Sequence, residues 1–106
     1  MARRLIANNE NIVLVSAASA WEIATKVRIG KLSGAAEVAA DIGGSILGQR
    51  FESLDITVVH AQRAGALPGP HRDPFDRMLA AQAQVESLPI VTNDIVFDGY
   101  GINRIW

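Results

Sequence analysis

The stretch DPFDRMLAAQAQVESLPIVTND, residues 73–94, decides the expected fold because it combines a well-marked helix with a short apolar strand. Asp73 is a favourable N-cap, Pro74 suits the first helical position, and the helix is expected to end near Pro89. Residues 89–92 then indicate a short buried strand, and the similar apolar run at 12–15 suits a strand buried on both faces. A helix followed directly by such a strand is one unit of an α/β fold.

The same alternation of helices and strands extends toward both ends of the chain. One helix is expected to start at a capping box, Ser19 to Glu22, and to stop at Gly30, while Thr57 is the expected N-cap of another. Further strands are expected at 12–15, 51–56 and 102–106, and further helices at 2–9, 35–48 and 58–66. This order predicts a single α/β domain over residues 1–106, with helices layered on a largely parallel sheet.

Composition excludes several classes of protein. The 106 residues include 10 basic and 11 acidic side chains, and the net charge of −1 argues against a basic protein that coats nucleic acid. The chain has no cysteine, which excludes disulfide frameworks, thiolate catalysis and zinc ribbons, and which fits a reducing cytoplasm. Its longest apolar stretch is shorter than the roughly 18–20 residues of a membrane span.

Three acidic residues are expected near the carboxyl edge of the sheet, where parallel α/β folds bind ligands. Glu22 and Asp76 lie in the first turns of their expected helices, and Asp94 directly follows the strand at 89–92. A carboxylate cluster needs a cation, and oxygen ligands without cysteine favour Mg²⁺ or Mn²⁺. Such a site could orient water and stabilise charge on a scissile phosphate.

Each acid also has a structural interpretation. Glu22 fits the third position of a capping box, Asp73 fits an N-cap, and Asp76 suits the positive end of a helix dipole. Asp94 could simply form a turn. Only the expected placement of these acids together at one edge of the sheet favours a functional interpretation over a structural one.

A few basic residues are candidates for contact with RNA phosphates. His71 and Arg72 lie in a loop rich in proline and glycine, and Lys26 lies near the end of a helix. Solvated side chains are the alternative interpretation of all three. His60 falls inside an expected helix, where a structural role is favoured.

Three segments together resemble the PIN-domain family, and in particular its VapC-type toxins. They are SAASAWEIATKVRIGKL at 16–32, HRDPFDRMLAAQA at 71–83 and IVTND at 90–94, and their order and spacing also agree with the family. The resemblance implies a three-layer fold whose mainly parallel central sheet is flanked by helices. It also implies a Mg²⁺- or Mn²⁺-dependent ribonuclease in the cytoplasm, a small VapB-like antitoxin as inhibitor, and a homodimer.

The resemblance also assigns site residues. The acids that match the metal site are Glu22, Asp76 and Asp94. Asp76 matches a direct metal ligand, and Asp73 matches an accessory acid of the subgroup. Thr92 and Asn93 match the polar positions that orient the last acid.

The sequence departs from the family at its start. Family members begin with a central strand resembling Leu-Leu-Asp-Thr-His, whose Asp is the first metal ligand, and no such segment occurs here. A misassigned or truncated start, a fold completed by dimer exchange, and an inactive relative that still binds partners would each explain this. For this chain we expect weak or absent metal binding and low nuclease activity.

Two other classes of function compete with a ribonuclease. A non-catalytic binding module would engage an antitoxin or a sister toxin chain. A phospho-acceptor signalling domain also places acids at a parallel-sheet edge, but it needs a lysine after a late strand, and no lysine follows Lys31.

Overall fold

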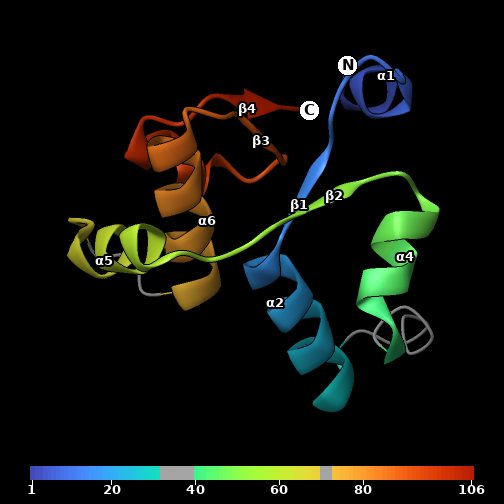
Figure 1. Ribbon diagram of the computed structural model, residues 1–106. Helices are drawn as coiled ribbons and strands as arrows, with labels where there is room; N and C mark the ends of the chain where they lie inside the picture. Colours follow the sequence, from blue (N-terminus) through green and yellow to red (C-terminus); the bar gives the residue numbers. More distant parts are fainter. Residues whose placement is uncertain (32–39, 70–72) are drawn as a thin grey trace. The chain divides into compact units, whose positions relative to one another are not determined.

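The computed structural model describes residues 1–31, 40–69 and 73–106 (Figure 1). The chain divides into two compact units, one made of residues 12–55 and the other of residues 1–11 together with 56–106. Part of the helix expected at 35–48 lies outside the described residues, as do His71 and Arg72.

The unit of residues 12–55 joins two parallel strands through helices. Its described elements are β1 (Leu14–Ser16), α2 (Ala17–Arg28), α4 (Ile42–Gly48) and β2 (Glu52–Leu54). β1 and β2 pair in register from Leu14 opposite Glu52 to Ser16 opposite Leu54. The amide of Glu52 also donates to the carbonyl of Val13 at 2.9 Å, so the ladder starts just before β1.

The start of α2 differs from the expected capping box. Ser16, the last residue of β1, is the N-cap, and its hydroxyl accepts from the amide of Ala18 at 3.0 Å. Because the strand leads directly into the helix, α2 begins before Ser19, and Glu22 lies beyond the first turn. The expected box of Ser19 and Glu22 is therefore wrong. The expected stop is confirmed, since Gly30 follows the last helical residues with a φ of 76°.

The first strand is also shorter and more exposed than expected. β1 covers residues 14–16 instead of 12–15, and Ile12 is 71% exposed. In the described part of the chain β1 has one hydrogen-bonded neighbour, β2. A strand with a single neighbour buries less of its surface than the inner strand of a large parallel sheet. The expectation that residues 12–15 are buried on both faces is therefore wrong.

The second unit contains a helix pair and a second parallel ladder. Its described elements are α1 (Ala2–Ala7), α5 (Val58–Ala66), α6 (Pro74–Glu86), β3 (Ile90–Val91), the 3₁₀ helix η1 (Ile95–Tyr100) and β4 (Arg104–Ile105). β3 and β4 are parallel, with Ile90 opposite Arg104. Thr57 and Asp73 cap α5 and α6 as expected. The sequence did not predict η1, since a helix this short shows little periodicity.

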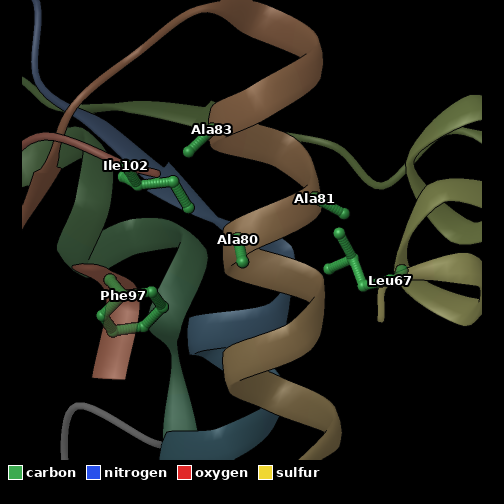
Figure 2. Packing of buried hydrophobic residues seen from close by; sticks show 7 residues of the cluster. Leu67, Ala80, Ala81, Ala83, Phe97 and Ile102 are labelled. Atoms are coloured by element: carbon green, nitrogen blue, oxygen red, sulfur yellow. The ribbon is translucent and has the colours of Figure 1, made fainter. Parts of the chain in front are cut away.

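The alanines of α6 form the centre of this unit. Ala80 and Ala81 are fully buried, and they belong to one apolar cluster with Leu67, Phe97 and Ile102. Figure 2 shows Leu67 beside Ala81, while Phe97 and Ile102 lie on the other side of the helix. Small side chains let neighbouring elements approach α6 closely. α6 therefore packs against both α5 and the segment that runs from η1 to β4.

A buried polar network joins α5 to α6. His60, which is 1% exposed, accepts the amide hydrogen of Thr57 at Nδ1 over 3.1 Å, and the Thr57 hydroxyl accepts from the His60 amide. Because Nδ1 is an acceptor, the ring proton belongs on Nε2, which lies 2.8 Å from Glu86 Oε1. The side-chain amide of Gln82 lies 3.4 Å from Nδ1. The expected structural role of His60 is thus consistent with its contacts.

Replacement of His60 by alanine is expected to destabilise the protein by about 2–3 kcal/mol. The substitution removes the ring acceptor of the Thr57 amide, which is one half of the capping box, and leaves Gln82 and Glu86 without their ring partner. Urea denaturation measures the change, with Gln62→Ala on the exposed part of α5 as the control, for which about 0.5 kcal/mol or less is expected. Equal free energies of unfolding for the two variants would contradict this account.

Candidate metal site

The first turn of α6 carries two of the candidate acids. Asp73 is the N-cap, and its Oδ1 accepts from the amides of Phe75 at 2.9 Å and Asp76 at 3.2 Å. Asp76 is partly buried at the third helical position, as expected from the sequence. The positive end of the helix dipole stabilises carboxylates here. Asp73 therefore has a structural role, because its hydrogen bonds stabilise the helical turn that contains Asp76.

The turn after β3 carries the last candidate acid. Asp94 is exposed and caps η1, since its Oδ1 accepts from the amide of Val96 at 3.0 Å. The Asp94 amide in turn donates to the hydroxyl of Thr92 at 3.1 Å. Asn93, between them, is exposed. Thr92 thus fixes the backbone on which Asp94 sits, while its orienting role toward a metal stays a prediction.

The elements that carry Asp76 and Asp94 belong to one unit. Asp94 precedes η1, whose Phe97 is buried in the same cluster as Ala80, one turn beyond Asp76 along α6 (Figure 2). The structure therefore packs α6, which carries Asp76, against η1, which Asp94 caps.

Glu22 belongs to the unit of residues 12–55. It lies in α2, partly buried, with Oε2 3.3 Å from Nζ of Lys26 in the following turn. Lys26, a candidate for contact with RNA, is thus paired with a candidate metal ligand. Such a solvated pair at i,i+4 spacing contributes little to stability and can be exchanged for other partners.

The candidate ligands fit a divalent cation by the chemistry of their donor atoms. Carboxylate oxygens are the donors that Mg²⁺ and Mn²⁺ prefer. Within residues 1–31, 40–69 and 73–106, no three or more His, Cys, Asp or Glu side chains meet in a way that could hold a metal ion. His71 and Arg72, the other candidates for RNA contact, lie outside these ranges.

Sequence reasoning missed an ion pair near Asp94. Arg104 of β4 donates to Asp98 through Nε at 2.7 Å and Nη2 at 3.2 Å. This hydrogen bond lowers the pKa of Asp98 and raises the pKa of Arg104. The negative charge of Asp94 raises the pKa of Arg104 further. The two residues meet because η1 turns the chain back to β4, and six residues of separation give no recognisable pattern in the sequence.

Removal of the Arg104 guanidinium is expected to return the pKa of Asp98 toward the ordinary aspartate value of about 3.9. Because folding lowers the pKa of Asp98, the pair stabilises the protein above the unfolded-state pKa. That contribution to stability is lost as the pH falls through the lowered pKa that Asp98 has in the folded state.

Carboxyl ¹³C NMR measures the titration of Asp98 in the wild type and in Arg104→Met. Asp55 provides a carboxyl elsewhere in the chain for comparison. An Asp98 titration that is identical in the two proteins would contradict the assignment of the shift to Arg104.

The family model described as PIN domain matches residues 1–103. Among the curated proteins, none matches significantly. The matched range includes all four candidate acids and ends just before β4. Within the described residues, no helix is long and apolar enough to cross a membrane.

Proposed function

The chain belongs to the PIN-domain family, and on this premise we propose that it is a Mg²⁺- or Mn²⁺-dependent endoribonuclease of the VapC type. The family match over residues 1–103 carries the proposal, since PIN domains are typically nucleases. The RNA substrate and the toxin subgroup rest on the three sequence segments that resemble VapC-type toxins.

The proposed metal ligands are Glu22, Asp76 and Asp94, with Asp73 as an accessory acid. Bound at these oxygens, the cation would supply charge for the scissile phosphate and a water of lowered pKa. The chain's own contribution is to hold the carboxylates. Asp73 orders the first turn of α6 below Asp76, and Thr92 orders the turn that carries Asp94.

The proposal includes an additional acid on a further strand. In the described residues the strands form two parallel sheets of two strands each, β1 with β2 and β3 with β4. Parallel sheets usually have more strands and are covered on both faces, and open strand edges pair readily with another strand. These edges support completion by the first strand of the family, which brings the first Asp. Without it, metal binding and cleavage should be weak.

The proposed partners are RNA, a small VapB-like antitoxin and a second copy of the chain, all in the cytoplasm. A protein partner is supported by large apolar side chains that stay exposed in the described structure. Val58 and Val59 at the start of α5 are 84% and 58% exposed. Exposed apolar surface of this kind is common where proteins associate.

A second candidate function is an inactive PIN-like binding module. The exposed apolar side chains at the start of α5 suit it as well as they suit a nuclease, because either could associate with a protein partner. Such a module would engage the antitoxin or a sister toxin chain without cutting RNA. Co-purification with a small partner, combined with no cleavage, would select it.

Cleavage of a labelled structured RNA tests the nuclease proposal. With Mg²⁺ or Mn²⁺ we expect slow cleavage, because the proposed site needs a further acid beside Glu22, Asp76 and Asp94. EDTA should abolish this cleavage, and Asp76→Asn should reduce it by about tenfold or more. The matched control is Asp55→Asn, which changes an exposed carboxylate that the proposal does not use.

The outcomes separate the two parts of the proposal. Cleavage that is insensitive to EDTA and to Asp76→Asn would contradict a metal-dependent nuclease. Fast Mg²⁺-dependent cleavage that Asp76→Asn abolishes would support the nuclease but contradict the need for a further acid.

A further inference from the structure

The C-terminal end of α5 needs hydrogen-bond donors from elsewhere in the chain. The last carbonyls of any helix have no partner within that helix. After α5 the chain turns extended at Leu67 and continues with Pro68, which has no amide hydrogen to donate. The usual backbone cap through the residue after the C-cap is therefore impossible here.

Arg77 of α6 supplies these donors. Its Nε and Nη2 donate to the carbonyl of Ala64 at 3.2 and 2.8 Å, and Nη2 also donates to the carbonyl of Leu67 at 2.7 Å. A guanidinium suits this position because it is planar, always charged, and favourable at the negative end of a helix dipole. The side chain of one helix thus caps the end of its neighbour.

This contact fixes the turn that carries the proposed metal ligand. Arg77 directly follows Asp76, so anchoring Arg77 to α5 limits the rotation and fraying of the first turn of α6. On the other side of the same turn, Asp73 holds the amides of Phe75 and Asp76. Asp73 and Arg77 therefore both restrain the turn that carries Asp76, one through a local contact and the other through a contact to α5.

We propose that Arg77 is a positioning residue of the nuclease site, which holds Asp76 in place by capping α5, and is not a contact for RNA phosphate. The proposal rests on the proposed function for the part that concerns the metal. A basic residue beside a catalytic acid would ordinarily be assigned to phosphate. Here the guanidinium donates to the main-chain carbonyls of Ala64 and Leu67. These carbonyls would lose their charged donor if Arg77 bound an RNA phosphate instead.

Loss of Arg77 should act locally. The other end of the helix pair is held independently by the contacts of His60 with Glu86 and Gln82. The alanine cluster packs between the two ends. Removal of the Arg77 cap should therefore loosen the first turn of α6 while the rest of the unit stays folded.

Amide hydrogen exchange of the full chain tests the anchoring. In Arg77→Met the amides of Phe75 and Asp76 should exchange about tenfold faster, while the Thr92 amide in the β3–β4 ladder should be unchanged. Arg77→Lys should restore little of this protection, because an ammonium cannot reproduce the planar fork. The control is Arg63→Met, which removes an arginine that donates to Gln84 on the same helix pair.

Mn²⁺ provides the second readout. Millimolar Mn²⁺ should broaden the NMR signal of Asp76 in the wild type and in Arg63→Met, and should broaden it several-fold less in Arg77→Met. A purely structural role for Arg77 would leave this broadening unchanged in a protein whose Thr92 amide shows that it is folded.

Two results would overturn the proposal. One is exchange of Phe75 and Asp76 in Arg77→Met within twofold of wild type. The other is an equally large increase in the exchange rate of the Thr92 amide, which would mean global destabilisation. Accelerated local exchange without any Mn²⁺ broadening in the wild type would uphold the anchoring and contradict the metal-binding part of the proposed function.

Discussion

The pairing of α5 with α6 is the constraint on which the unit containing residues 56–106 depends. Three kinds of contact hold the pair together. His60 binds Glu86 and Gln82 at one end, Arg77 caps α5 at the other, and the apolar cluster that includes Leu67 and Ala81 packs the two helices together (Figure 2). The polar contacts matter because buried donors and acceptors without partners are costly, while the alanines permit close packing. The other face of α6 can then receive Phe97 and Ile102, which place η1 and β4.

Asp73 and Asp94 have structural roles that do not exclude a function for their carboxylates. Asp73 and Asp94 each cap a helix, and each does so through Oδ1. Capping fixes the orientation of a carboxylate without using both of its oxygens, so a capping acid can also serve as a ligand. The structural interpretation of these acids therefore does not compete with the functional one. It explains how the backbone holds the carboxylates in defined directions.

Local signals account for what the sequence predicts well. The N-caps Thr57 and Asp73, the proline after Asp73 and the stop at Gly30 act within a few residues, and the structure confirms each of them. The start of α2 was predicted wrongly because two serines could cap it, and only the position of β1 decides between them.

Contacts between distant segments could not be predicted in this way. Arg77 meets the carbonyl of Ala64 because two helices pack together, and Arg104 meets Asp98 because η1 turns the chain back. No spacing rule describes either contact. The same limit applies to the candidate metal site. Each candidate acid lies in its own motif, but whether the acids come together depends on tertiary structure, and Glu22 lies in a different unit from Asp76 and Asp94.

The central proposal is that this PIN-family chain carries a metal-dependent nuclease site in which Glu22, Asp76 and Asp94 act together with a further carboxylate on an additional strand. The most direct measurement compares RNA cleavage by the chain extended with a strand of the family type that carries Asp, and by the same extension with Asn in its place. The account predicts Mg²⁺-dependent cleavage at least about a hundredfold faster with Asp. Equal cleavage by the two extended proteins would contradict it.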